Sequence, residues 1–201
     1  MTKVETPEHL GGHGNKGWID SNSIKFLKSK PALDITTVLD IGCGIGGMRD
    51  VCHNLDLKWQ GIDGDENILD FLDDEAKKNV IIHDFTKGKS NQLADVYDLG
   101  WSTEFLEHVE EKYQENYMDA YSRCRYIVTT AAPPGWEGHH HVNCQDQKYW
   151  VDVFESYGMI FDEVMTRQVR GHSLMYTTAG KTNPRKQWVK QTGMFFRNGR
   201  K

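Results

Sequence analysis

Two short segments of the chain bring together acids and histidines that can transfer protons. In TEFLEH, Glu104, Glu107 and His108 are three and four positions apart, so they share one face if the segment begins a helix. In GHHHVN, a run of histidines that includes His140 and His141 follows Pro-Pro-Gly. Histidine has an unperturbed pKa of about 6.5 and accepts protons at neutral pH. We therefore expect the general base among His141, His140 and Glu104.

The same two segments predict a metal site. Two carboxylates and imidazoles from two loops can hold Mg²⁺ or a transition metal, which would activate a hydroxyl by lowering its pKa. The expected ligands are Glu104, Glu107, His108 and His141. Two alternatives stay open: Glu107 and His108 only support the helix start, and the histidines form a polar lid that binds substrate without catalysis.

A glycine-rich turn is the second feature with chemical meaning. In VLDIGCGIGG, glycines at 42, 44, 46 and 47 follow a β-branched run and open a helical pattern, so the backbone can approach a ligand closely. The turn fits both GxGxxG and DxGxGxG. Asp40 suits a cationic amino group, whereas a pyrophosphate prefers bare amides. Asp63, at the end of the next strand, can accept hydrogen bonds from both hydroxyls of a ribose.

Alternating strand and helix patterns would position these residues. Strands are expected at 36–41, 58–63, 79–84, 95–102, 125–132, 161–169 and 192–197. Helices are expected near 19–27, at 48–55, at 66–78, at about 104–123 with Thr103 as its cap, and at 147–157 with Asp146 as its cap. The first five strands alternate with helices, which predicts an α/β fold with a parallel sheet wound on both faces.

Four segments in this order resemble a known family. VLDIGCGIGG, GIDGDENI, IIHDFT and DVYDLGWSTEFLEHV are similar to the motif series of class I S-adenosylmethionine-dependent methyltransferases, over roughly residues 36 to 165. The resemblance implies a single Rossmann-like doubly wound sheet of about seven mostly parallel strands whose last two form an antiparallel end. It also implies S-adenosylmethionine as the cofactor.

The resemblance assigns roles to individual positions. Asp40 and the glycines at 42, 44 and 46 would surround the methionine part of the cofactor, and Asp63 would hold the ribose. Gly64, Asp84 and Phe85 would contact the adenine, and two residues of the fourth strand would close the site. The expected cofactor-binding residues are Asp40, Gly42, Cys43, Gly44, Gly46, Asp63, Gly64, Asp84, Phe85, Trp101 and Ser102.

The methyl acceptor is less well defined than the cofactor. We expect O-methylation of a small polar molecule, such as a sugar or a hydroxylated metabolite. ExxEH with a downstream histidine is similar to metal-assisted O-methyltransferases, so methylation of an RNA ribose 2′-oxygen is the runner-up. GWST stands where NPPY or DPPY would favour DNA base-amine methylation. A nicotinamide-dependent oxidoreductase, using the same turn and Asp63, and a non-catalytic cofactor-binding protein remain alternatives.

Length and charge limit the organisation of the chain. The 201 residues fit one domain, which we divide into an N-terminal extension with a cover helix (1–34) and a methyltransferase domain with a basic C-terminal end (35–201). The net charge of −5 argues against coating nucleic acid by bulk charge. Nine of the 24 Lys and Arg residues follow Glu163, with no acid among them. This end is either a solvated surface or a docking surface for an anionic acceptor.

Cysteine usage and hydropathy bear on the compartment. Four scattered cysteines without a CxxC pair suit a reducing environment. The first residues contain no apolar core of a signal peptide, and no run of eighteen apolar residues occurs. We therefore expect a cytoplasmic protein that does not enter a membrane, while the oligomeric state is left open.

Overall fold

The β-branched segments of the sequence form one seven-stranded sheet. The computed structural model describes residues 7–10 and 17–200. The strand order is β4-β3-β2-β5-β6-β9-β7. The strands are β2 (Thr37–Ile41), β3 (Lys58–Asp63), β4 (Val80–Ile82), β5 (Tyr97–Ser102), β6 (Cys124–Thr129), β7 (Met159–Phe161) and β9 (Met194–Asn198). Only the pairs that include β9 are antiparallel, so the expected mostly parallel sheet with an antiparallel end is confirmed.

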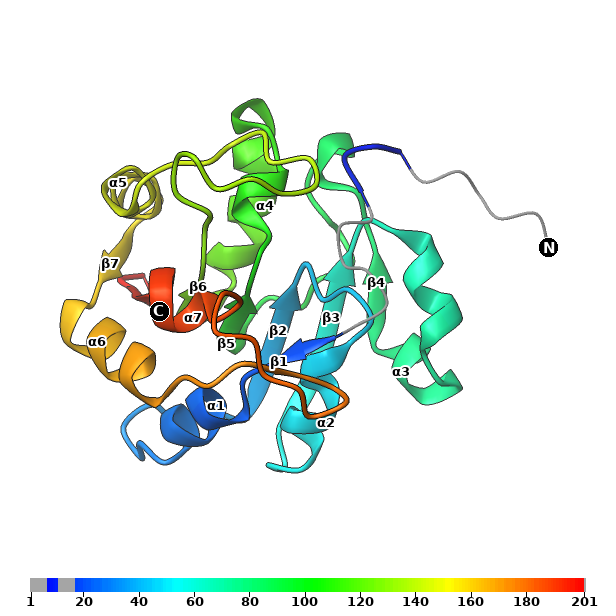
Figure 1. Cartoon of the computed structure of the whole chain (residues 1–201), viewed down its shortest axis with the longest axis horizontal. Helices are drawn as coiled ribbons and strands as arrows, with labels where there is room; N and C mark the ends of the chain where they lie inside the picture. Colours follow the sequence, from blue (N-terminus) through cyan, green and yellow to red (C-terminus); the bar gives the residue numbers. More distant parts are fainter. Residues whose placement is uncertain (1–6, 11–16, 201) are drawn as a thin grey trace.

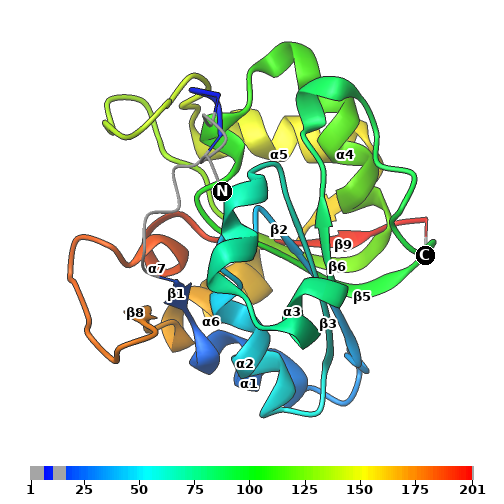
Figure 2. The same ribbon diagram turned by 90° about the vertical axis from the view of Figure 1, so that its right-hand side faces the viewer.

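Alternation along the strands divides the core into two layers. In β2, Val38 packs into one hydrophobic cluster, while Leu39 and Ile41 point to the other. Helices α4 (Gln114–Ser122) and α5 (Gln147–Ser156) contribute to the cluster of Leu39. The cluster of Val38 contains side chains of α1 (Ser21–Lys28), α2 (Gly47–His53), α6 (Glu163–His172) and α7 (Trp188–Thr192). Helices therefore cover both faces of the sheet (Figures 1 and 2).

The described part of the predicted N-terminal extension packs against the main fold. Strand β1 (Trp18–Ile19) pairs antiparallel with β8 (Tyr176–Thr177). Asp20 caps α1 and also accepts a hydrogen bond of 2.6 Å from the Ser173 hydroxyl. Residues 1–6 and 11–16 of the extension lie outside the described residues. The division of the chain into an extension and a methyltransferase domain after residue 34 stays a prediction.

None of the described helices is long and apolar enough to cross a membrane.

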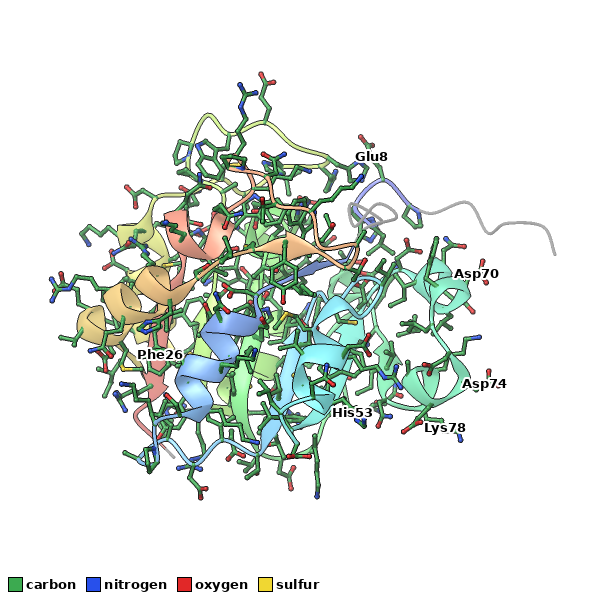
Figure 3. All side chains as sticks on the ribbon, turned by 60° about the horizontal axis from the view of Figure 1, so that its bottom comes forward. Glu8, Phe26, His53, Asp70, Asp74 and Lys78 are labelled. Carbon is green, nitrogen blue, oxygen red and sulfur yellow. The ribbon has the colours of Figure 1, made fainter. Side chains whose placement is uncertain are left out.

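The helix expected at 66–78 is wrong as a single element. The structure has the 3-10 helix η1 (Glu66–Phe71) followed by the short helix α3 (Asp74–Lys78). The Asp73 side chain accepts a hydrogen bond of 2.7 Å from the Ala76 amide and thereby begins a new helix. Asp70, Asp74 and Lys78 point away from the core (Figure 3).

The helix expected at 104–123 is also wrong at its start. Glu104 has a φ of +55°, and the 3-10 turns η3 (Leu106–His108) and η4 (Glu111–Tyr113) precede α4. Thr103 does not cap a helix, because the N-cap position of η3 is Phe105, which makes no side-chain cap hydrogen bond. The Glu104 amide donates instead to the Thr130 hydroxyl, at 3.0 Å. This contact across neighbouring strand ends overrides the local helical pattern.

The strand expected at 161–169 is a helix for most of its length. β7 ends at Phe161, and the Asp162 side chain accepts a hydrogen bond of 2.8 Å from the Met165 amide to cap α6. Met165, Thr166 and Val169 are buried, which is the one-sided burial of a surface helix. The strand prediction for 161–169 is therefore wrong beyond Phe161.

Candidate active site

A cavity of about 680 Å³ opens where β2, β3, β4 and β5 end. Parallel strands end at one edge of the sheet, which is where ligands bind in this class of fold. The expected cofactor residues that line it are Asp40, Gly42, Cys43, Gly44, Asp63, Gly64, Asp84 and Phe85. Of the other expected residues, Trp101 is buried in the core, and the Ser102 hydroxyl donates to the Ile41 carbonyl at 2.8 Å. Gly46 is the N-cap of α2, with a φ of +72°.

The turn after β2 needs glycine for both conformation and space. Gly42 has a φ of +72°, and a Cβ added there would lie 2.7 Å from the Phe105 ring. The Asp63 carboxylate holds this turn, because it accepts hydrogen bonds from the amides of Gly44, at 2.8 Å, and Asp65, at 2.9 Å. The glycine turn and the end of β3 therefore form one connected wall.

Asp40 is a buried acid at the end of the cavity wall. Its carboxylate accepts a hydrogen bond of 3.1 Å from the Trp59 indole. The indole crosses Gly61, where a Cβ would lie 2.8 Å from the ring. Burial raises the pKa of Asp40 to about 7; the Trp59 hydrogen bond opposes this shift and the charge of Asp63 adds to it. A bound cation would restore the ionised form.

The third acid of the cavity, Asp84, is tied to residues near the N-terminus. Its carboxylate accepts from the Thr86 amide at 2.8 Å and lies 3.0 Å from His9 Nε2. Burial raises the pKa of Asp84, but the hydrogen bonds from Thr86 and His9 outweigh it, so the net pKa is lowered. Leu10 lies over Gly64, whose Cβ would be 2.5 Å from Leu10 Cδ2. The sequence patterns gave no signal for His9 or Leu10.

Residues of η3 and of the histidine loop meet on the other side of the cavity, where His108 and His141 line it and Glu107 is buried behind them. One potential ligand atom from each of Glu107, His108 and His141 lies within 4.8 Å of the others. The amides of Val142 and Asn143 both donate to the Glu107 carbonyl, at 2.9 and 3.1 Å, which docks the loop on η3. Glu104, the fourth expected metal ligand, is outside this three-residue group.

Burial favours the neutral forms of these groups. It raises the pKa of Glu104 to about 9, with a further contribution from the charge of Glu107, and it also raises the pKa of Glu107. Burial and the charge of His141 lower the pKa of His108 to about 4. Glu107 Oε1 accepts from the Ala132 amide at 3.1 Å, but Oε2 is buried without a hydrogen-bond partner among the described residues. The cluster can hold a divalent cation or share protons.

The histidine loop fixes the tautomer of one imidazole. His141 Nδ1 lies 2.9 Å from the Trp136 carbonyl, which can only accept, so Nδ1 carries the proton and Nε2 has the lone pair. His140 has a φ of +47°, and its Nε2 is buried without a partner among the described residues. His139 Nε2 reaches the Leu10 carbonyl at 3.2 Å.

The sequence matches one family model over part of its length. Residues 39–125, from β2 to the start of β6, match the model described as a methyltransferase domain. No curated protein matches the chain.

Solved structures extend the likeness of the fold. A magnesium protoporphyrin IX methyltransferase from Synechocystis PCC 6803 with bound SAM is 16% identical, with a TM-score of 0.56 over 88% of this chain and 76% of that one. A TehB-like SAM-dependent methyltransferase from Corynebacterium glutamicum is 15% identical, with a TM-score of 0.57 over 90% and 88%. An O-methyltransferase of a Brevibacillus brevis trans-AT PKS, in complex with S-adenosyl-L-homocysteine, is 15% identical, with a TM-score of 0.53 over 75% and 55%.

Proposed function

We propose that this chain is a class I S-adenosylmethionine-dependent methyltransferase that methylates an oxygen of a small polar acceptor. The match of residues 39–125 to a methyltransferase domain and the likeness of the fold to solved S-adenosylmethionine-dependent methyltransferases support this proposal. The observation that carries the proposal is a single cavity, with acids and a glycine turn on one side and an acid–histidine cluster on the other. A sugar or a hydroxylated metabolite is the acceptor class. The free thiols of all four cysteines support a cytoplasmic location.

The acids of the cavity fit the parts of the cofactor. Asp40 would bind the ammonium of its methionine part, which explains why a buried acid with a raised pKa is placed there. Asp63 would accept from the ribose hydroxyls, and Asp84 and Phe85 would contact the adenine beside Gly64. Gly42, Cys43, Gly44 and Gly46 shape the turn, and Trp101 and Ser102 support it from β5. When bound, S-adenosylmethionine supplies an electrophilic methyl group.

The acid–histidine cluster would handle the proton of the acceptor hydroxyl. Methyl transfer needs alignment of the nucleophile and removal of its proton. His141 Nε2 is the preferred acceptor atom, because the Trp136 carbonyl fixes its lone pair. His140 and Glu104 line the same cavity and are the other candidates.

A metal-assisted reaction is the second candidate. Glu107, His108 and His141 provide one carboxylate and two imidazoles within 4.8 Å, and Glu107 Oε2 is a buried oxygen without a described partner. This donor set fits a transition metal better than Mg²⁺, which prefers oxygen ligands. A metal there would lower the pKa of the acceptor hydroxyl, with Glu104 next to the ligands. An RNA ribose 2′-oxygen is the alternative acceptor of this reaction.

Cofactor binding can be tested with one carboxylate change. Asp63→Asn removes the charge that accepts from two backbone amides, so S-adenosylhomocysteine should bind at least tenfold more weakly in isothermal titration calorimetry. Glu66→Gln changes an exposed acid three residues further on and should leave binding unchanged. Wild-type protein that binds NADH but not S-adenosylhomocysteine would establish the oxidoreductase alternative instead.

Catalysis needs a separate test. Acceptors are first found by incubating the protein and labelled S-adenosylmethionine with fractionated cell extract, followed by mass spectrometry of labelled products. His141→Gln should then lower turnover at least 100-fold and spare S-adenosylhomocysteine binding, because it removes the proposed base. His53→Gln, at the exposed end of α2, is the matched control (Figure 3). Full activity in the presence of a chelator would exclude the metal-assisted route, and unchanged turnover of His141→Gln would refute the base.

A further inference from the structure

The basic C-terminal end divides into two groups of cations. Arg167 pairs with Glu163 at 3.2 Å, Arg197 pairs with Asp162 at 2.7 Å, and Arg170 donates to the Gly193 carbonyl at 2.7 Å. These three cations stabilise α6 and its contacts. Of the others, Arg185 and Lys186 line the cavity.

The loop between β8 and α7, which is held by internal hydrogen bonds, carries Arg185 and Lys186. They precede Gln187, a buried residue whose side chain accepts from the Met175 amide at 2.9 Å and donates to the Met175 carbonyl at 2.8 Å. The Asn183 side chain accepts from the Arg185 amide at 2.9 Å, and the Asn183 carbonyl accepts from the Lys186 amide at 3.0 Å. The backbone beneath both cations is therefore fixed by internal hydrogen bonds.

Two tryptophans hold the Lys186 side chain. Its Nζ lies 5.5 Å from the Trp18 ring centre and 5.8 Å from that of Trp188, and these two rings pack edge to face at 5.3 Å. Trp18 and Trp188 also line the cavity. The ammonium is thus oriented by neutral rings, which leave its charge uncompensated.

No described acid neutralises the two cations. Within residues 7–10 and 17–200, neither Arg185 nor Lys186 forms an ion pair. On the histidine side of the cavity, Glu110 pairs with Lys112 at 2.7 Å. Lys186 lines the same cavity as Glu104, His108 and His141 of the acid–histidine side. The β8–α7 loop (orange) and the β6–α5 loop (yellow-green) lie on the same side of the molecule (Figure 2).

We propose that the methyl acceptor carries an oxyanion, a phosphate or a carboxylate, which Arg185 and Lys186 bind while its hydroxyl faces the acid–histidine cluster. This inference rests on the proposed function, because it names the acceptor class of the same site. Arg185 can bind two oxygens of a planar or tetrahedral oxyanion, and Lys186 adds a point charge.

The test measures anion binding to the full chain. Inorganic phosphate and acetate are titrated into wild-type protein, with and without saturating S-adenosylhomocysteine, and binding is followed by chemical shifts and by the melting temperature at constant ionic strength. The double variant Arg185→Gln/Lys186→Gln should bind the preferred anion at least tenfold more weakly. Lys181→Gln/Lys190→Gln removes the same charge from exposed positions that do not line the cavity and should bind it like wild type.

The outcomes separate the two proposals. Preference for phosphate or for acetate assigns the source of the oxyanion, and saturable binding that only the first double variant loses supports the site. Equal weakening in both double variants, or non-saturable binding to wild type, would overturn it in favour of bulk charge. A short single-stranded RNA that outcompetes phosphate and depends equally on all four cations would also overturn it. Binding of S-adenosylhomocysteine should be unchanged in both double variants. It therefore tests the proposed methyltransferase function separately from the anion site. If the first double variant has a lower melting temperature than wild type, the test is repeated with Arg185→Gln alone, which leaves the tryptophan contacts of Lys186 intact.

Discussion

Binding of S-adenosylhomocysteine should depend steeply on pH because of Asp40. In the free protein, burial raises the pKa of this carboxyl to about 7, so most of it is protonated at pH 6. An ammonium binds the ionised form, and the ligand's amino group stays protonated up to about pH 8. Affinity should therefore rise about tenfold per pH unit from pH 5 to about 6.5 and level off near pH 7.5.

Calorimetry can measure this dependence directly. Titrations at pH 6 in two buffers of different ionisation enthalpy should show the release of about one proton per ligand bound. Asp40→Asn should give a pH-independent affinity that is about 10- to 100-fold weaker than that of wild type at pH 7.5, because a charge-assisted contact is lost. Asp50→Asn, an exposed acid on α2, is the control and should behave like wild type.

Whereas the affinity for S-adenosylhomocysteine should rise with pH, the contribution of Asp40 to the free energy of unfolding of the free protein should fall. A pKa raised from 3.8 to about 7 means that the folded state binds the proton more tightly than the unfolded chain. The contribution of Asp40 is then fully present below pH 3.8 and is lost as pH rises through 7, by about 4 kcal/mol in total. Asp40→Asn should flatten this part of the stability profile. A pH-independent wild-type affinity with no proton release would refute the role of Asp40.

Three further changes test the fold and the glycine turn. Burial raises the pKa of Asp98, but the hydrogen bonds that it accepts at the start of β2 and its ion pair with Arg125, at 3.0 Å, outweigh burial. Together they lower the pKa of Asp98 to about 2. Asp98→Asn should therefore cost about 1–2 kcal/mol at pH 7 in urea unfolding, after allowance for solvent screening, and the difference should shrink as pH falls from 4 through 2. Gly42→Ala should weaken S-adenosylhomocysteine binding at least tenfold in calorimetry, because its Cβ would meet Phe105 at 2.7 Å and its φ is +72°. Asp20→Ala should lower the free energy of unfolding by about 2–4 kcal/mol in denaturant titrations, since it removes the cap of α1 and a buried acceptor.

Local sequence patterns were enough to predict strands β2 to β6 and the wall of the cavity nearest the glycine turn. Each strand from β2 to β6 has its own burial pattern. Asp40 is the second-last residue of β2, Asp63 is the last residue of β3, and Asp84 follows β4 by two residues. Because parallel strands end at one edge, knowing the strands was enough to bring these acids together. The same local reasoning found the cap of α5 at Asp146.

The opposite wall of the cavity depends on long-range contacts that local patterns do not predict. His141 reaches His108 because amides of its loop bond to the Glu107 carbonyl, a pairing between irregular segments that no periodicity encodes. Glu104 leaves the predicted helix because its amide bonds to Thr130. Arg185 meets the cavity only through a loop held by buried side chains. Patterns of burial specify helices and strands, but the positions of loops depend on hydrogen bonds between distant residues, so only the folded chain shows them.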